Sequence, residues 1–311
     1  MWAELEEGQR DREPPVFAHA TVLRDETVGL LDPRPGAVYV DATVGGGGHT
    51  EELLERAQGC VVIGIDHDPV ALAAASERLS GHGDRFVPIR GGFGELVTLL
   101  GEAGFTRVDG ILADLGLSSA QLADSARGMS FRLDGPLDMR MDPSRGETAS
   151  ELIARLDQDA LANVIYRFGE ERRSRRVARC IKLAEQDGRL NTTTDLRRAV
   201  VRAVGPARVG GVDPATRTFQ ALRIAVNSEL DQLTSLLDHA PDILVEGGVL
   251  AVISFHSLED RLVKRAFQER SRWERLTKKP ITAGTGELTA NPRSRSAKLR
   301  AARLLANARD S

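Results

Sequence analysis

Four consecutive glycines, Gly45 to Gly48, constrain the fold of this chain more than any other feature of its sequence. They separate an apolar run at residues 37–40 from a helix-favouring run at residues 51–56. A second apolar run, residues 60–65, then ends on Asp66. Glycine has no Cβ, so such a loop lets the backbone approach a ligand closely, and an acidic residue at the tip of the second strand is placed to bind ribose hydroxyls. The pattern predicts a nucleotide-binding unit of strand, glycine loop, helix and strand.

The residues around the glycines indicate the kind of nucleotide. A dinucleotide site usually carries Gly-x-Gly-x-x-Gly or Gly-x-Gly-x-x-Ala, whereas here Thr50 occupies the third place. Asp41 adds a carboxylate before the first glycine, and that carboxylate would repel a pyrophosphate. It suits a ligand with a cationic amino-acid tail, such as S-adenosylmethionine. A glycine run after a strand can also be a simple tight turn, and the sequence leaves that alternative open.

Helices and strands continue to alternate after this unit. We expect a helix at residues 69–79, a strand at 85–90, a helix at 95–103 and a strand at 108–114. Strands and helices at this spacing form βαβ units with a parallel sheet, and ligands bind at the carboxyl ends of such strands. Four residues that suit a nucleotide site fall at those ends: Asp41, Asp66, Phe93 and Asp114.

The alternation stops at about Ala123 and resumes with a buried strand at residues 249–254. The intervening sequence favours helices, including a long basic helix at 170–186 and a helix from Asp213 with an apolar stripe up to Leu237. Two weak strands near the end of the chain should close the sheet as a hairpin, at residues 275–281 and 297–302. We therefore expect a helical insertion within one α/β domain: a disordered leader at 1–18, the α/β domain at 19–122 and 213–311, and the inserted all-helical domain at 123–212.

Composition narrows the functional classes. Lys and Arg number 42 and Asp and Glu 45, so no global field drives nucleic-acid binding and any such partner must be met by local patches. Cys60 and Cys180 provide neither a disulfide framework nor zinc-like spacing, so we expect no metal. The first eighteen residues resemble no signal peptide, and no apolar run is long enough to span a bilayer. We expect a soluble cytoplasmic protein without a membrane partner.

Several further stretches carry a resemblance to one family. The stretches that match are HATVL from His19, DATVGGGGH from Asp41, DLGLSS from Asp114 (with Gln121), GPLDMRMD from Gly135, RTFQALRI from Arg217, SFHSLED from Ser254 and NPRSRSAKLR from Asn291. Together they resemble the small-subunit ribosomal RNA cytosine-N4 methyltransferases, the RsmH or MraW family, from His19 to about Leu304. Ala120 stands where many relatives have proline.

The resemblance implies a fold and an activity. The fold would be the class I, Rossmann-like sheet of S-adenosylmethionine-dependent methyltransferases, with the inserted helices recognising the substrate. The activity would be transfer of a methyl group to the exocyclic N4 of a cytidine in the decoding region of 16S ribosomal RNA. The implied cofactor is S-adenosylmethionine, and the implied partner is the small ribosomal subunit. The sequence leaves the oligomeric state open between a monomer and a weak dimer.

The resemblance also implies residue roles. Gly47, Gly48 and His49 would line the methionine part of the cofactor, Asp66 would bind the ribose hydroxyls, and Phe93 would lie against adenine. The pocket would be completed by two further residues, Asp114 and Gln121. Each position has a simpler alternative: Asp66 can be the N-cap ahead of Pro69, Phe93 a core aromatic, and His49 a plain residue at a helix start.

Two further groups of residues are candidates for binding the substrate. Asp114 could also hold a hydrogen of the target amine. The candidates for the target-base pocket are Ser118, Asp138, Arg140 and His256, which loop salt bridges and helix caps would explain equally well. The candidates for RNA contacts are Arg172, Arg173, Arg175, Arg176, Arg293 and Arg295, for which a solvated helix face with Glu170 and Glu171 is the alternative. A cytosine inside a duplex cannot present N4 to a cofactor, so the target must be single-stranded or flipped out.

The sequence leaves two other functional classes open. A nicotinamide-dependent oxidoreductase uses the same strand-loop-helix unit, but Thr50, Asp41 and the lack of an evident acid/base pair for hydride transfer speak against it. A non-catalytic RNA-binding assembly factor could keep the fold without the activity. The complete set of predicted cofactor residues speaks against that second alternative.

Overall fold

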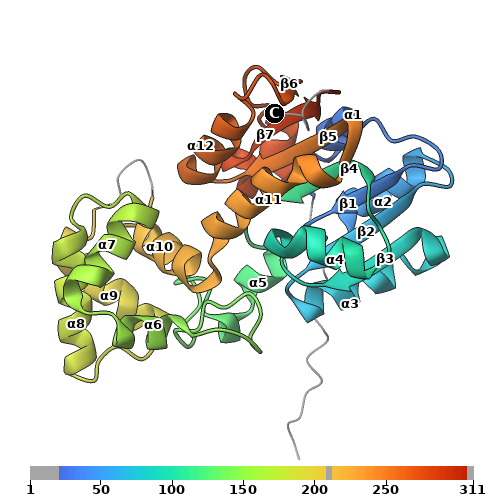
Figure 1. The fold of residues 1–311 in the computed structure, drawn as a ribbon. Helices are drawn as coiled ribbons and strands as arrows, with labels where there is room; N and C mark the ends of the chain where they lie inside the picture. The colour runs from blue at the N-terminus through green and yellow to red at the C-terminus, as the bar shows by residue number, and fades with distance from the viewer. Residues whose placement is uncertain (1–20, 208–211, 307–311) are drawn as a thin grey trace, which may run out of the picture.

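The computed structural model describes residues 21–207 and 212–306, and it shows a seven-stranded β-sheet with helices packed on both faces (Figure 1). The strand order is β3-β2-β1-β4-β5-β7-β6. Strands β1 to β5 pair in parallel, whereas β7 runs antiparallel to both β5 and β6. The strands span Val38–Asp41 (β1), Val61–Asp66 (β2), Phe86–Arg90 (β3), Val108–Asp114 (β4), Leu244–Ser254 (β5), Trp273–Arg275 (β6) and Lys298–Leu304 (β7).

The direction in which strands are added reverses between β1 and β4. After β1 the chain adds β2 and β3 on one side, and after β4 it adds β5 on the other. The loops that leave neighbouring strands β1 and β4 therefore diverge and open a crevice at their carboxyl ends. This topology confirms the predicted α/β class. The predicted terminal hairpin is present as β6 and β7, although β6 ends at Arg275 and Ile281 makes only an isolated bridge to Leu299.

Helices cover both faces of the sheet and also form a region beside it. They span Arg24–Leu31 (α1), Gly48–Arg56 (α2), Pro69–Arg78 (α3), Leu96–Glu102 (α4), Ser119–Ala123 (α5), Ala149–Arg155 (α6), Gln158–Gly169 (α7), Ser174–Gln186 (α8), Thr193–Val204 (α9), Thr216–Asn227 (α10), Glu229–Ile243 (α11), Ser257–Ala266 (α12) and Thr285–Ala290 (α13). Short 3-10 turns lie at Ser80–Arg85 (η1), Phe93–Glu95 (η2), Ser125–Arg127 (η3) and Pro292–Ser296 (η4).

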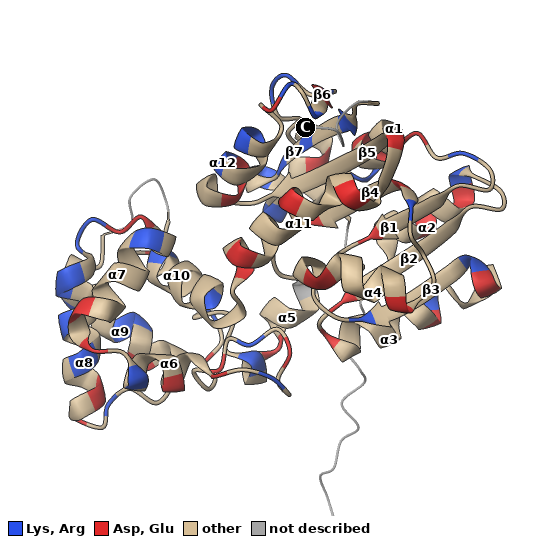
Figure 2. Ribbon diagram, viewed as in Figure 1, with Lys and Arg blue, Asp and Glu red and all other residues tan. Residues whose placement is uncertain are grey.

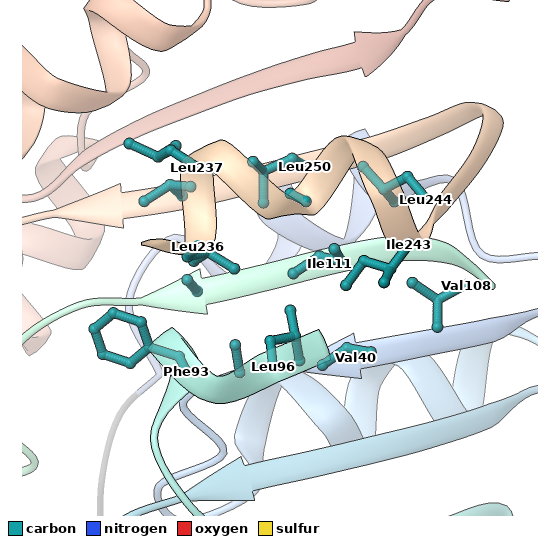
Figure 3. Packing of buried hydrophobic residues seen from close by; sticks show 14 of the residues in the cluster. Val40, Phe93, Leu96, Val108, Ile111, Leu236, Leu237, Ile243, Leu244 and Leu250 are labelled. Atoms are coloured by element: carbon teal, nitrogen blue, oxygen red, sulfur yellow. The ribbon is translucent and has the colours of Figure 1, made fainter. Parts of the chain in front are cut away.

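One face of the sheet carries α4, α11 and α12. Figure 3 shows Leu236, Leu237 and Ile243 of α11 packed over Ile111 of β4 and Leu250 of β5. Each of these side chains is at most 5 % exposed, and burying one such side chain contributes about 1.5–3 kcal/mol to folding. The inner parallel strands β1, β2 and β4 are buried on both faces, which explains their continuous apolar sequences.

The other face carries α1, α2 and α3. Val28 of α1, Leu53 of α2 and Ala75 of α3 join Tyr39 of β1 and Val62 of β2 in a second buried cluster. This packing fixes α2, and therefore the glycine loop in front of it, against the carboxyl end of β1. The position of the loop is set by the core rather than by the loop itself.

Helices α6 to α10 form a helical region with a core of its own, beside the sheet (Figure 1). Leu152, Ile165, Ile181 and Leu196 come from α6, α7, α8 and α9 and are buried together. Helix α10, which the sequence-based division assigns to the second α/β segment, adds Phe219 and Leu222 to this core. The division of the chain into domains at 123 and 212 stays a prediction.

Two helix predictions are wrong in detail. The apolar stripe up to Leu237 lies on two helices, because Ser228 between α10 and α11 has a left-handed φ of 50°. The basic helix begins at Ser174 rather than at 170, because Glu170 also has a φ of 50° and caps α7. Both breaks occur at residues that carry no strong sequence signal for a helix end.

The predicted leader at 1–18 and the first residues of the HATVL stretch lie outside the described residues. Among the described residues, no helix combines the length and apolar character needed to cross a bilayer.

Candidate active site

The glycine loop joins β1 to α2 and forms one wall of a pocket at the carboxyl ends of the strands. Gly45 and Gly47 have φ values of 50° and 80°, which favour glycine. A Cβ on Gly48 would lie 1.8 Å from Oγ1 of Thr21, so a side chain has no room there. Backbone atoms of Gly45, Gly46 and Gly48 line the pocket, whereas Gly47 immediately precedes α2 and shapes the turn.

Asp66 ends β2 and also lines the pocket. Its Oδ2 accepts a hydrogen bond from the Gly45 amide and its Oδ1 from the Asp68 amide, each at 2.9 Å. Burial raises the pKa of this carboxyl. Each oxygen keeps a second lone pair with which it can accept a ligand hydroxyl. The N-cap ahead of Pro69 is Asp68, whose side chain accepts from the Val70 amide, so the alternative of Asp66 as that cap is wrong.

Asp114 ends β4 with a buried oxygen, Oδ1, that has no hydrogen-bond partner among the residues that the structure describes. Burial, and then the charge of Asp41, raise the pKa of Asp114 well above its usual range. His49 faces the other oxygen, with Nδ1 4.0 Å from Oδ2, while its Nε2 lies 3.1 Å from the Val22 carbonyl oxygen. A carbonyl only accepts, so Nε2 carries a hydrogen. The unpartnered oxygen is costly and would be satisfied by a donor or a cation on a ligand.

Asp41 lies behind the pocket rather than in it. Its side chain is buried, and Oδ2 accepts a 2.8 Å hydrogen bond from Thr50 Oγ1 in the first turn of α2. Burial raises the pKa of Asp41 to about 7. The expectation that this carboxylate meets the cationic tail of a ligand is therefore wrong. Asp114, on the neighbouring strand, has the exposure to the pocket that the sequence analysis assigned to Asp41.

Phe93 and Gln121 both lie at the pocket. Phe93 belongs to the core cluster beneath α11 as well, so its predicted contact with adenine and its role as a core aromatic are compatible. The side-chain amide of Gln121 is already used, because Nε2 donates to Asp68 Oδ2 at 2.9 Å and Oε1 accepts from the Ser118 amide at 3.1 Å. Gln121 therefore fixes α5 to the cap of α3 and shapes the pocket wall.

The structure does not bring the four target-base candidates together. Ser118 lines the pocket and caps α5 by accepting from the Gln121 amide at 3.1 Å. Asp138 and Arg140 bind each other through two hydrogen bonds of 2.8 and 2.7 Å and are not among the lining residues. His256 caps α12, where its Nδ1 accepts from the Glu259 amide at 3.3 Å.

Two buried glutamates that the sequence analysis missed, Glu229 and Glu259, also line the pocket. Glu229 pairs with Arg223 through two hydrogen bonds of 2.7 and 2.8 Å. Glu259 accepts from the Phe255 amide at 2.8 Å. Burial raises the pKa of Glu259, but His256 and Arg223 outweigh it and lower the pKa overall. The spacing of His256 and Glu259 signals a capping box, whereas no local pattern signals Glu229.

Glu229, His256 and Glu259 place one potential ligand atom each within 4.8 Å of one another, which is a spacing that could hold a metal ion. Their present contacts are those of an ion-pair network, because Arg223 binds Glu229 and backbone amides bind Glu259. The prediction that the protein uses no metal is therefore neither supported nor contradicted by this cluster.

The RNA-contact candidates are dispersed. Arg293 lines the strand-end pocket, and Arg295 is exposed in η4. Arg173, Arg175 and Arg176 are exposed at the start of α8, where Figure 2 shows basic residues on the outer side of the helical region. Arg173 also donates to the Val204 carbonyl at 3.1 Å. The remaining candidate, Arg172, lies in a different hollow, between α7, α10 and α12.

The arrangement at the strand ends suits a nucleoside that carries a positive charge. Asp66 offers two acceptors for hydroxyls, Phe93 offers an apolar surface, and Asp114 offers an unpartnered acceptor in a buried setting. The strand order, with the antiparallel β7 beside β5, and this pocket at the β1/β4 reversal define a class I methyltransferase fold of the kind that uses S-adenosylmethionine.

Comparison with known proteins identifies the family. The model of the MraW methylase family matches residues 16–305, and the chain belongs to that family. The chain is 64 % identical over 290 residues to the ribosomal RNA small subunit methyltransferase H of Sorangium cellulosum (strain So ce56), covering 93 % of this chain and 92 % of the relative. It is 53 % identical to the protein of the same name from Prochlorococcus marinus (strain MIT 9303), covering 94 % of each chain.

Similarity to solved structures is more distant. An S-adenosylmethionine-dependent O-methyltransferase from Thermotoga maritima overlaps with a TM-score of 0.41 at 12 % identity, covering 91 % of this chain and 64 % of that chain. The fold class rests on the strand order described above and not on this overlap.

Proposed function

We propose that this chain methylates the exocyclic N4 amine of a cytidine in 16S ribosomal RNA, in the decoding region, with S-adenosylmethionine as the methyl donor. Membership of the MraW methylase family and the names of its relatives support a ribosomal RNA small-subunit methyltransferase. The donor and the target atom rest on the sequence motifs and on the chemistry of the pocket. The observation that carries the proposal is the buried Oδ1 of Asp114 beside the glycine loop, which has no hydrogen-bond partner within residues 21–207 and 212–306.

The residues at the strand ends fit this cofactor. S-adenosylmethionine supplies a methyl group on a positively charged sulfur and leaves as a neutral sulfide, so a nucleophilic residue is not needed. Asp66 would accept the ribose hydroxyls, and Phe93 would pack against the adenine. Gly47 would shape the turn beside Gly48 and His49, which would border the methionine part. Gln121 would hold the wall of the pocket.

Asp114 can also position the target amine. The N4 lone pair of cytosine is delocalised into the ring, so the site must align the amine and favour its pyramidal form. Oδ1 of Asp114 can accept a hydrogen bond either from the ammonium group of the cofactor or from the target amine. Burial holds the pKa of Asp114 high in the free protein, and a cation beside it would favour the ionised form.

The RNA would reach the pocket from the side of the helical region. We assign substrate recognition to the inserted helices, with Ser118, which lines the pocket, and His256, whose neighbour Phe255 lines it, as target-base candidates. The protein would act in the cytoplasm on naked 16S ribosomal RNA or on the small subunit, as a monomer or a weak dimer. The target nucleotide would be single-stranded or flipped out of its helix.

Mass spectrometry of nucleosides tests the proposal directly. Small-subunit RNA from cells that contain the protein should yield N4-methylcytidine that is missing from cells without it. Adding the purified protein and S-adenosylmethionine to the unmethylated subunits or RNA should restore the modification. A methyl group found on cytosine C5 or on the ribose instead would refute the proposed target atom.

Calorimetry with the purified chain separates this proposal from its alternatives. We expect binding of S-adenosylmethionine and of S-adenosylhomocysteine, and no binding of a nicotinamide dinucleotide. Preference for the dinucleotide would indicate an oxidoreductase. RNA binding without affinity for either adenosyl compound would indicate a non-catalytic assembly factor.

A further inference from the structure

A second hollow lies between the helical region and the sheet, separate from the strand-end pocket. It is bordered by the C-terminal end of α7, the N-terminal end of α10 and the first turns of α12, and its lining residues are Tyr166, Arg167, Glu170, Arg172, Arg217, Leu258 and Arg261. We call it the α7–α12 groove. Arg172 is the one member that the sequence analysis associated with RNA.

The α7–α12 groove is strongly positive. Four of its seven lining residues are arginines, from α10, α12, the end of α7 and the segment after it, and one is acidic. The acidic residue, Glu170, is already engaged, because its carboxylate accepts from Ser257 Oγ at 2.6 Å and from Arg261 Nη2 at 2.9 Å. Hydrogen bonding by Ser257 and Arg261 lowers the pKa of Glu170, so the carboxylate stays charged and orients Arg261.

An aromatic ring is exposed in the same groove. Tyr166 is 59 % exposed, although most large apolar side chains of this region are buried in its core. An exposed ring beside several guanidinium groups is the combination with which proteins bind single-stranded nucleic acid, because each base can stack on the ring while arginines contact the phosphates. An acidic peptide would use the arginines but would not need the ring.

The α7–α12 groove and the strand-end pocket share one short segment of the chain. Leu258 lines the groove, while its neighbours Phe255 and Glu259 line the pocket. This segment, at the start of α12, therefore borders both cavities. A strand that crosses this segment would connect the groove to the pocket.

We propose that the α7–α12 groove binds the sugar-phosphate backbone of the single-stranded RNA that flanks the target nucleotide, with one flanking base stacked on Tyr166. This inference rests on the proposed function, which supplies RNA as the substrate, and it adds the route by which the strand enters. Arg172, Arg217 and Arg261 contact phosphates, and Glu170 holds Arg261 in place for that contact.

The test measures binding of a fluorescein-labelled single-stranded RNA of about 12 nucleotides to the full chain by fluorescence anisotropy, over a range of salt concentrations. The groove variants are R172E, R217E, Y166A and Y166F. The matched control is R189E, because Arg189 is also an exposed arginine of the helical region but does not line the groove. Calorimetry with S-adenosylmethionine checks that every variant keeps an intact strand-end pocket.

We expect R172E and R217E each to weaken RNA binding about 3- to 10-fold and to flatten the salt dependence by about one unit per lost phosphate contact. Y166A should weaken binding at least about 5-fold, while Y166F, which keeps the ring, should bind like the unmodified chain. R189E should show neither effect, and cofactor affinity should be unchanged throughout.

The outcomes separate the two proposals. If the unmodified chain binds RNA but R172E, R217E and Y166A bind it with the same affinity and salt slope, the groove is not the RNA path, and the proposed function stands. If arginine reversal weakens binding but Y166A does not, the stacked base is refuted. If the unmodified chain binds neither free RNA nor small subunits, the proposed function itself fails.

Discussion

The carboxylates at the strand ends and those of the helical region are held in opposite ways. Burial raises the pKa of Asp41, Asp66 and Asp114 at the carboxyl ends of β1, β2 and β4. In the helical region and the loop that leads into it, hydrogen bonds lower the pKa of Asp134, through Thr192 and Thr194, and of Glu147, through Arg155.

This difference shows which region is optimised for stability. The carboxylates around the helices cap helices or pair with arginines, so their charges stabilise the folded state. Those at the strand ends are costly in the folded protein and become favourable when a ligand supplies a donor or a cation. Binding sites commonly contain groups that reduce the stability of the free protein.

The largest expected effect is on the pH dependence of stability, with opposite signs in the two regions. Asp41 has a pKa of about 7 in the folded state against 3.8 for the free side chain. Its contribution therefore favours the folded state at low pH, and the free energy of unfolding falls by on the order of 4 kcal/mol as the pH rises from about 4 to about 7. Urea unfolding of D41N without ligand should show this loss removed, because an amide keeps the hydrogen bond with Thr50 and carries no charge.

Asp134 provides the opposite case. Its pKa is lowered to about 2, so its contribution is complete above its ordinary pKa and is lost as the pH falls toward 2. D134N should therefore lose less stability than the unmodified chain as the pH falls below 4, and the pH dependence of its stability between pH 4 and 7 should be unchanged.

Equal slopes of stability against pH for D41N and the unmodified chain would contradict the assignment of the strand-end carboxylates as destabilising.

The next largest effect is expected at Asp114, where affinity and stability should move in opposite directions. D114N removes the charge that would meet a cationic cofactor, so affinity for S-adenosylmethionine should fall about 10- to 100-fold. The same change removes a carboxyl whose pKa is raised by burial and which therefore costs free energy on folding at neutral pH, so the ligand-free protein should melt at a higher temperature.

Turnover at saturating cofactor distinguishes the two roles of Asp114. If D114N lowers affinity but leaves turnover unchanged, Asp114 binds the cofactor and does not act on the target amine. If both fall, it also positions the amine. Unchanged affinity together with an unchanged melting temperature would show that Asp114 neither binds the cofactor nor destabilises the free protein.

A smaller effect is expected from adding one methyl group to the glycine loop. The Cβ of G48A would meet Thr21 Oγ1 at 1.8 Å, and relieving such a contact costs about 1–3 kcal/mol. G29A is the matched control, because none of the described residues outside α1 has an atom within 4 Å of the Cβ position of Gly29 in α1, and alanine favours a helix by about 1 kcal/mol over glycine.

Thermal unfolding and cofactor titration measure both glycine variants. G48A should lose stability and affinity, while G29A should be at least as stable as the unmodified chain. The double variant T21A/G48A removes the obstructing hydroxyl and should recover most of the loss. Failure of T21A to rescue G48A would show that the loop is restricted by something other than Thr21.

The sequence predicts the site residues whose positions follow from the order of strands along the chain. Asp66 and Asp114 each end an apolar run, and parallel strands bring such ends to one edge, so their meeting at the pocket follows from the alternation. Asp41 ends a run in the same way but faces α2 instead. Which face a terminal side chain takes depends on the pleat of the strand, and the sequence does not fix where the pairing ends.

The sequence does not predict contacts between side chains of different helices. Arg223, Glu229 and Glu259 lie on α10, α11 and α12, and they meet only because Ser228 adopts a left-handed conformation that turns α11 away from α10. Serine at that conformation is uncommon, so the sequence predicts one continuous helix there. The α7–α12 groove is missed for the same reason, since its arginines come from separate elements.

The smallest effect is expected from the exposed arginines of α8. Arg175 and Arg176 lie outside the α7–α12 groove and are exposed, so a phosphate contact there is screened by salt and contributes little. R175E and R176E should each weaken RNA binding by no more than about 2- to 3-fold and change the salt slope by at most about one unit. Cofactor affinity should not change, because these residues are not part of the strand-end pocket. Anisotropy titrations at two salt concentrations provide the measurement, with R217E alongside for comparison. If R175E or R176E loses more RNA affinity than R217E, the RNA runs along the outer face of α8 and not through the α7–α12 groove. A dispersed basic surface would then direct the substrate to the buried acidic pocket.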